Sequence, residues 1–360
     1  MEYNELQYWV AFKHIHGIGP VHFKKLIDNF PSLSHAWDTG ISELLSLGFE
    51  EKLAERIIQE KKKITPSQIL EEIYSQDIKV ITLQDENYPK LLREISFAPT
   101  LLFYKGNIQT KNALAIVGTR KISPYGKDIT HEFSYHLSRN GYIIVSGLAL
   151  GADTIAHTAA LKASGVTWAV LGSGIDDTSI YPSSNRTLAF NIIASGGAVF
   201  SEYPPKTPPM KMNFPQRNRI ISGLSLGTLI TEAPEKSGAL ITAYFALEQN
   251  REVFAIPGSI FSRNVSGNHK LIKLGAKLVT SIDDILDTFN IARKTPSLSE
   301  HKSFSDEEKL LIQCMKNEPL HIDEIIRQSE LGAQKIHSLI TILELRGDIK
   351  NVGNGMYRKV

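Results

Sequence analysis

The spacing of apolar positions changes near Asp77. Up to residue 72 they recur every three or four residues, as in LQYWVAFKHI, HFKKLIDNF and EKLAERIIQEKKKI, which predicts helices separated by glycine or proline breaks. After Asp77 come short apolar runs, namely IKVITL, ALAIVG, YIIVSG, VTWAVLG, GAVFSE, GTLITEA and REVFAIPG. Each run ends in a small residue or a turn, and a helical segment follows most of them. Continuously apolar runs are typical of strands that a parallel sheet buries on both faces.

These patterns predict an α/β protein with additional modules at both ends. Residues 1–72 are expected to form a helical domain, and residues 73–290 an extended Rossmann-like parallel sheet core. In such folds ligands bind beyond the carboxyl ends of the strands, where helix N-termini present free amides. We therefore expect the functional residues directly after the apolar runs.

The chain changes again near residue 290. ARKTPSLSEHKSFS is polar and predicts a linker over residues 291–304. Ser305 stands three residues before Glu308 and predicts a capped helix. Two further helical segments and two short strands around a glycine turn follow, and this order predicts a winged helix over residues 305–360.

The turn Gly17-Ile18-Gly19-Pro20 lies between two short predicted helices, as in helix–hairpin–helix and SAM-like modules. It could present backbone amides to a phosphate. It could equally be a tight connection that needs glycine dihedrals.

Charge and composition restrict the classes of ligand. The 360 residues carry a formal net charge of only +2, so binding of nucleic acid would need a local concentration of basic residues. The single cysteine, Cys314, excludes an internal disulfide framework and a CxxC-type metal site, and a reducing cytoplasm is expected. No stretch approaches the length of a membrane span, and we expect no membrane association, no cofactor and no metal.

A first basic segment lies between Glu94 and Asp128, which enclose five positive side chains and no acidic one. Within it, IVGTR ends a predicted strand. Gly118 allows close approach of a ligand, Thr119 can donate a hydroxyl, and the Arg120 guanidinium can grip phosphate oxygens. Lysines alone would fit a solvated surface, but an arginine at a strand–helix junction favours an anion site.

A second acid-free segment runs from Tyr203 to Thr231. Lys211 and Phe214 could offer one charge to a phosphate and one ring face to a base, the combination used for single-stranded nucleic acids. Phe214 could also be an ordinary core ring. Arg217 and Arg219 project about 200° apart on a helix, so we expect one to meet phosphate and the other to pair internally or at a subunit contact.

Other glycine turns give weaker signals. Gly147 precedes a helix on which Asp153 and His157 lie four residues apart, and capping or packing is favoured over a catalytic pair because no nucleophile is evident nearby. The spacing of the turns fails the G-x-G-x-x-G pattern, so an NAD site is not expected.

The segment SLGTLITEAPEKSGALITA resembles the phosphoribohydrolase pattern P-G-G-x-G-T-x-x-E. Gly227, Thr228 and Glu232 match, but Ser225-Leu226 replace the glycine pair, which weakens an enzymatic interpretation. Ser237 and Gly238 then begin another predicted helix, whose amides could take an anion.

Together, IVGTR, SGLALGADTIAH, VLGSGID, SEYP, FPQRNRIISGLS, TEAPEKSGALITA, FAIPGS and GNHKLIKLGA resemble the DNA-processing family DprA, also called Smf. The resemblance implies a bacterial cytoplasmic, non-catalytic protein that binds single-stranded DNA as a homodimer. It also implies that the protein protects incoming strands and loads the RecA recombinase during natural transformation. Some members have a lysine after Tyr-Pro where this chain has Ser183-Ser184, so a phosphate contact there would depend on Arg186. The predicted DNA-binding residues are Gly118, Thr119, Arg120, Gly147, Arg186, Lys211, Phe214, Arg217, Asn218, Arg219, Ser237 and Gly238.

Two alternatives to a single-strand binder remain. One is a nucleoside-monophosphate phosphoribohydrolase centred on Glu232. The other is a transcription factor acting through the winged helix, whose presumed recognition helix carries only Lys335, His337 and Arg346 and is poor for reading the major groove.

Overall fold

A nine-stranded sheet forms the centre of a computed structural model that describes residues 3–289, 305–315, 319–329, 331–345 and 348–359. The strand order is β1-β2-β6-β5-β4-β3-β7-β8-β9. Its strands are β1 Lys79–Thr82, β2 Leu101–Gly106, β3 Ala113–Val117, β4 Ile143–Ser146, β5 Thr167–Leu171, β6 Ala198–Ser201, β7 Gly227–Ile230, β8 Glu252–Ala255 and β9 Lys277–Leu278.

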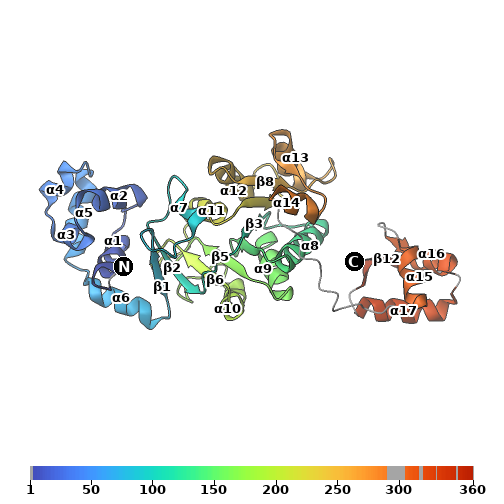
Figure 1. Cartoon of the computed structure of the whole chain (residues 1–360). Coiled ribbons are helices and arrows are strands. Elements are labelled where there is room, and N and C mark those ends of the chain that lie inside the picture. The colour runs from blue at the N-terminus through green and yellow to red at the C-terminus, as the bar shows by residue number, and fades with distance from the viewer. Residues whose placement is uncertain (1–2, 290–304, 316–318, 330, 346–347, 360) are drawn as a thin grey trace. The chain divides into compact units, whose positions relative to one another are not determined.

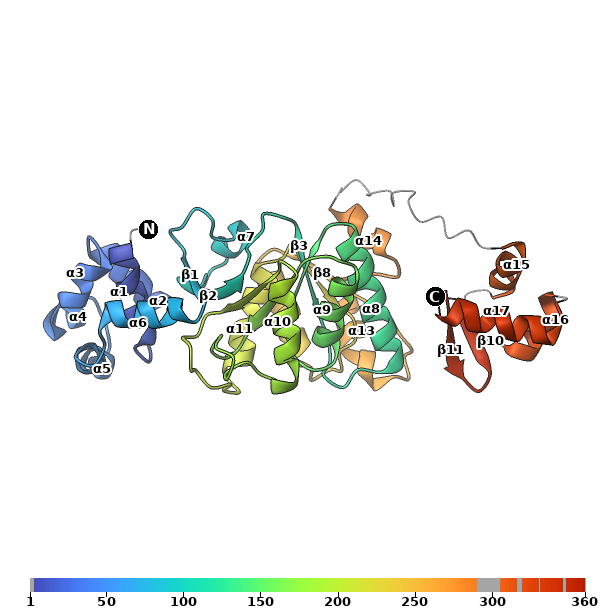
Figure 2. The same ribbon diagram turned by 90° about the horizontal axis from the view of Figure 1, so that it is seen from below.

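Helices cover both faces of this sheet (Figures 1 and 2). Along β3, Ala113, Ala115 and Val117 pack into one apolar core, and the alternate residues Leu114 and Ile116 pack into another. The helices that follow β1 are α7 Lys90–Arg93, α8 Pro124–Arg139, α9 Ala152–Lys162, α10 Arg186–Ala194, α11 Asn213–Gly223, α12 Gly238–Glu248, α13 Ser266–Lys273 and α14 Ile282–Thr288. Burial on both faces explains why the strands read as uninterrupted apolar runs, and the predicted α/β core is confirmed.

One edge of the sheet differs from the expected parallel arrangement. Strand β2 runs antiparallel to both of its neighbours, β1 and β6. A parallel pair needs a crossover connection, usually a helix, and the β1–β2 connection contains only the four-residue α7. Neither β2 nor the two-residue β9 was predicted from the apolar runs.

The order of the parallel strands places a topological switch point at β3. From β3 the chain adds β4, β5 and β6 on one side, then returns to place β7 and β8 on the other side. The loops after β3 and β7 therefore separate at the carboxyl edge of the sheet. A ligand-binding crevice is expected between such loops.

The N-terminal helices pack directly against the sheet, and residues 1–293 form one compact unit. Trp9 and Phe23 from the helices share an apolar core with Leu101 and Phe103 of β2. The predicted helical region is observed, but its last helix continues beyond residue 72. Its helices are α1 Tyr3–His14, α2 Pro20–Asn29, α3 Leu33–Asp38, α4 Ile41–Ser46, α5 Glu51–Lys61 and α6 Pro66–Ser75.

The described residues from Ser305 onward belong to a second compact unit, which is the predicted winged helix. Ser305 and Glu308 form the expected capping box at the start of its first helix. The predicted linker at residues 291–304 and Arg346 lie outside the described residues. The elements are α15 Asp306–Cys314, β10 Leu320–His321, α16 Ile322–Ser329, α17 Ala333–Leu345, β11 Ile349–Gly353 and β12 Met356–Lys359.

Throughout the described residues, every helix is too short or too polar to cross a membrane.

Candidate nucleic-acid interface

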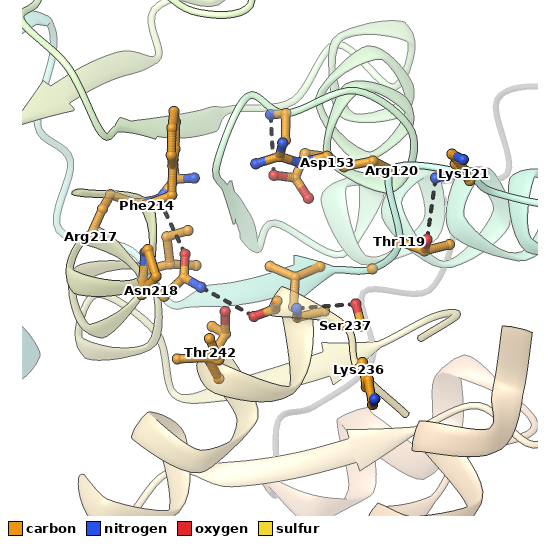
Figure 3. A pocket seen from close by; sticks show the side chains of 18 of the residues that line it. Thr119, Arg120, Lys121, Asp153, Phe214, Arg217, Asn218, Lys236, Ser237 and Thr242 are labelled. Atoms are coloured by element: carbon orange, nitrogen blue, oxygen red, sulfur yellow. Dashed lines mark hydrogen bonds between the residues drawn. The ribbon is translucent and has the colours of Figure 1, made fainter. Parts of the chain in front are cut away.

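A cleft of about 800 Å³ opens at the switch point, between the loops that follow β3 and β7. We call it the strand-end cleft. Figure 3 shows side chains from the β3–α8 loop, from α11 and from the start of α12 converging on it. Nine of the twelve predicted residues line it, namely Gly118, Thr119, Arg120, Lys211, Phe214, Arg217, Asn218, Ser237 and Gly238.

The loop after β3 is held by backbone contacts that leave its arginine exposed. The Thr119 amide donates to the carbonyl oxygen of Glu232 at 2.7 Å, and the Thr119 hydroxyl accepts from the amide of Lys121 at 3.2 Å. A Cβ at Gly118 would lie 2.7 Å from the Cβ of Ala152, so only glycine fits there. Arg120 and Lys121 are exposed at the rim, where each can reach a phosphate.

Phe214, in the first turn of α11, presents a half-buried ring to the cleft. The ring centroid lies 5.5 Å from the Arg120 guanidinium carbon and 5.8 Å from the Tyr181 ring. The ring therefore lies within an aromatic and cationic group, and is not one of the fully buried core rings. This arrangement resembles the stacking platforms on which proteins hold unpaired bases.

Arg217 forms the base of the cleft and is only 4% exposed. Its Nη1 donates to the carbonyl oxygen of Gly147 at 2.7 Å and to that of Val170, and its Nε donates to the Asn218 side chain at 3.2 Å. Burial lowers the pKa of Arg217 to about 10, which still leaves the guanidinium charged at neutral pH. A Cβ at Gly147 would lie 2.7 Å from this guanidinium, so Gly147 acts on the cleft by making room for Arg217.

Arg219 points away from the strand-end cleft. It donates to Glu202 at 2.6 Å, and Lys13 of α1 contacts the other oxygen of the same carboxylate at 3.4 Å. Burial would raise the pKa of Glu202, but the two cations outweigh it and hold that pKa below its usual value. Arg219 is therefore the one of the two arginines that pairs internally, and its contact with Glu202 joins α11 to the N-terminal helices.

Asp153 and His157 do not form a pair. Asp153 lies within the first turn of α9, whose cap residue is Gly151, so the expected helix cap is wrong in detail. Its carboxylate accepts from the amides of Gly147 and Ala149 at 3.1 and 3.2 Å. His157 instead contacts Thr167 at 2.6 Å, and burial lowers its pKa to about 3. Both residues stabilise the turn and the core, as the preferred interpretation expected.

The start of α12 closes the opposite side of the cleft. Ser237 caps the helix by accepting from the amide of Ala239 at 3.3 Å, and Gly238 is its first residue, as predicted. The Asn218 side chain donates to the carbonyl oxygen of Gly238 at 3.3 Å, which ties α11 to α12 across the cleft.

The charge of the cleft is positive at its rim. Arg120, Lys121, Lys211 and Lys236 line it with exposed side chains. Among its described lining residues, Asp153 is the single acidic one, and it is buried. A polyanion entering the cleft would therefore meet cations first.

Arg186 lies outside the lining of the cleft. Its guanidinium donates to the carbonyl oxygen of Thr178 at 2.9 Å, and its side chain is exposed at the start of α10. The structure does not bring it together with the nine lining residues.

Glu232 is placed as a structural carboxylate. It is 1% exposed, and its two oxygens accept from the amide and the hydroxyl of Ser123 at 2.8 and 2.7 Å. Ser123 is in turn the cap residue of α8. With both oxygens used at a helix terminus, Glu232 is poorly placed to act on a ribose.

Several lining residues were absent from the predicted set, among them Lys121, Lys236, Tyr181 and Asn264. Lys236 directly precedes the predicted helix start at Ser237, and Tyr181 stands beside Pro182 in a glycine-rich turn. Asn264 follows β8, so the rule that functional residues come after strands would have found its loop.

The profile of the DNA recombination-mediator protein A family matches residues 79–290, and that of the DprA winged helix domain matches residues 293–355. The chain belongs to the DNA recombination-mediator protein A family. The residues that line the strand-end cleft lie within the first of these ranges, and the winged helix up to the turn before β12 lies within the second.

Members of this family from several bacteria are similar over most of the chain. Protein Smf of Synechocystis is 41% identical over 79% of this chain and 73% of its own length. DNA processing protein DprA of Bacillus subtilis is 45% identical over 59% of this chain and 71% of its own length.

Two solved structures share the fold. DNA processing protein A of Streptococcus pneumoniae superposes with a TM-score of 0.69 at 36% identity, covering 79% of this chain and 99% of that chain. DNA processing protein A of Helicobacter pylori gives a TM-score of 0.53 at 31% identity, covering 59% and 95%. The latter structure concerns the single-stranded DNA binding mode of that protein.

Proposed function

We propose that this chain binds single-stranded DNA in the strand-end cleft without chemical conversion of the strand. The observation that carries the proposal is that four exposed cations and the half-buried Phe214 ring line the same cleft, with Arg120 over the ring. Phosphates would meet Arg120, Lys121, Lys211 and Lys236, and a base would stack on Phe214. The single-stranded DNA binding of the Helicobacter pylori relative supports the choice of ligand.

An unpaired strand suits this cleft better than a duplex. A base can reach the Phe214 ring only when it is free of its partner strand, because stacking on a side chain requires an accessible base face. Contacts to phosphates carry no sequence information, so binding should be tolerant of sequence.

We further propose that the chain works as a homodimer in the bacterial cytoplasm, where it protects incoming strands and loads the RecA recombinase onto them during natural transformation. Membership of the family supports this role. Exposed apolar side chains on α12, Tyr244 and Leu247, offer a surface suited to self-association.

A mobility-shift comparison of single- and double-stranded oligonucleotides of equal length tests the binding proposal. Preference for the single strand, lost on Phe214→Ala, is the expected result. Equal affinity for both forms, unchanged by this substitution, would show that the cleft is not the site.

The later steps need separate measurements. Sedimentation equilibrium should give a dimer. RecA should form filaments faster on strands coated with this protein than on the same strands coated with a heterologous single-strand binder. A monomer, or equal filament growth, would remove the corresponding part of the proposal.

A further inference from the structure

The loop after β8 carries the two most exposed large apolar side chains among the described residues. Ile260 is 81% exposed and Phe261 is 91% exposed. The loop itself is held in place, since the amides of Phe261 and Ser262 donate to the hydroxyl and the carbonyl oxygen of Ser259 at 3.3 and 2.9 Å. A fixed loop that holds an aromatic ring in solvent suggests a binding role for the ring.

This loop lies next to the strand-end cleft. Strand β8 is the neighbour of β7 in the sheet, and Asn264, three residues beyond Phe261, lines the cleft. The Ser266 hydroxyl accepts from the amide of Glu235 at 3.1 Å, in the turn that leads into α12. On the other side, the Tyr125 hydroxyl donates to the carbonyl oxygen of Pro257 at 2.9 Å. The loop is therefore anchored at both of its ends, to the start of α8 and to the turn before α12.

The segment of the chain that contains the loop is positively charged. No acidic residue occurs from Val253 to Ile282, whereas this stretch contains four positive ones, Arg263, Lys270, Lys273 and Lys277. All four are exposed. Like the two basic segments described above, this stretch contains no acidic residue, and it favours a polyanionic ligand.

A second copy of the chain is the other partner that could cover the exposed Ile260 and Phe261. A two-fold contact through the loop would bring the exposed Arg263 close to its own copy, which costs free energy. A nucleic acid would neutralise the same charge. The charge of the loop therefore favours a nucleic-acid strand.

We infer that Phe261 is a second base-stacking residue, with Arg263 contacting phosphate, for a strand that leaves the cleft across the loop after β8. The inference rests on the proposed single-strand binding. Phe214 lies over the end of β5, because a Cβ at Gly172 would be 2.9 Å from its ring. Four strand spacings separate β5 from β8 in the order β5-β4-β3-β7-β8, or about 19 Å. Only a DNA strand long enough to span this distance can stack bases on both Phe214 and Phe261.

Binding by a short and a long oligothymidine tests the assignment, with Phe261→Ala, Phe261→Tyr and Arg120→Ala compared with the parent. For the long oligonucleotide, Phe261→Ala should weaken binding about tenfold, whereas Phe261→Tyr should bind like the parent because it keeps the ring. For an oligonucleotide that fills only the strand-end cleft, Phe261→Ala should bind like the parent. Arg120→Ala should weaken binding of both.

A fluorescent reporter gives an independent readout. The three native tryptophans, Trp9, Trp37 and Trp168, are buried, so Phe261→Trp adds an exposed one. Its emission should be quenched when a base stacks on it. Phe190→Trp is the matched control, because Phe190 on α10 is 69% exposed and lies outside the lining of the cleft. Emission from the control should stay unchanged.

The outcomes separate the inference from the function on which it rests. If Arg120→Ala weakens binding while Phe261→Ala leaves the long strand unaffected, the second stacking position is wrong and the cleft stands. If neither variant weakens binding, the proposed site itself is wrong. If Phe261→Ala changes the sedimentation of the free protein and not its affinity for the strand, the loop contacts a second copy instead.

Discussion

Replacement of Arg120 by alanine removes one of the four exposed cations of the strand-end cleft and leaves its framework intact. The Arg120 side chain contacts Phe214 only through the face of the ring, at 5.5 Å, and the loop is held by the backbone of Thr119. The variant should therefore fold normally. Its effect should be confined to the ligand.

The size of the effect follows from counterion release. Each phosphate neutralised on a single strand contributes about 0.7 to the slope of log affinity against log salt. With four exposed cations engaged, the slope is about −2.8, and affinity should fall about 50-fold between 50 and 200 mM salt. With three cations left, the slope becomes about −2.1 and the fall about 20-fold. Arg217 does not enter the count because its guanidinium is buried against carbonyl oxygens.

Fluorescence anisotropy of labelled oligothymidine across a salt series measures both slopes. Lys162→Ala is the matched control, since Lys162 is an exposed cation at the last turn of α9, which begins at the carboxyl edge and runs to the opposite edge of the sheet. It should keep the parent slope. Identical slopes for the parent and Arg120→Ala would refute the assignment of Arg120 to a phosphate.

Three further outcomes are expected. Phe214→Ala should weaken single-strand binding about tenfold and Phe214→Tyr should not, as titration by anisotropy can show; equal weakening by both would contradict stacking. Glu232→Gln should lower the free energy of unfolding by about 1–3 kcal/mol in urea melts, because it disrupts the capping contacts of α8. Neither the parent nor this variant should release free base from nucleoside monophosphates. Base release by the parent that the variant abolishes would instead support the hydrolase. Glu202→Gln should destabilise the protein by about 3–5 kcal/mol at neutral pH, because it leaves two buried cations unpaired. The pKa of Glu202 is lower in the folded than in the unfolded state, so the stability that this carboxylate contributes is present above its unfolded pKa and is lost as pH falls through its folded pKa. The melting temperatures of the parent and Glu202→Gln should therefore converge in acid. A difference that stays constant with pH would argue against the ion pairs.

The sheet core and the winged helix could be predicted from local pattern alone. Buried parallel strands are apolar on both faces, so their runs are visible in the sequence, and the Ser305–Glu308 cap is a local signal. The antiparallel β2 could not be predicted in this way, because its direction depends on a pairing between segments distant in the sequence. The length of α6 beyond residue 72 was missed for a related reason, as helix ends depend on packing.

Those residues of the candidate site that lie at strand ends could be predicted from the sequence. Gly118, Arg120 and Phe214 follow or adjoin strand ends, and all three line the cleft. The fates of Arg217 and Arg219 could not be read from helical spacing, because each depends on partners elsewhere in the chain: the carbonyl oxygens of two strand ends for one, and Glu202 for the other. An arginine that a protein buries for its own structure looks the same in the sequence as one that binds a phosphate.

Photo-cross-linking would show whether an unpaired strand lies in the strand-end cleft with a base on Phe214. A 4-thiothymidine-substituted single strand would be irradiated in complex with the full chain, and the adducts would be mapped by mass spectrometry. We expect adducts on the peptides that carry Phe214 and Arg120, and these adducts should be lost when unlabelled single strand competes. Adducts confined to the winged helix or to the opposite edge of the sheet would show that the strand binds elsewhere.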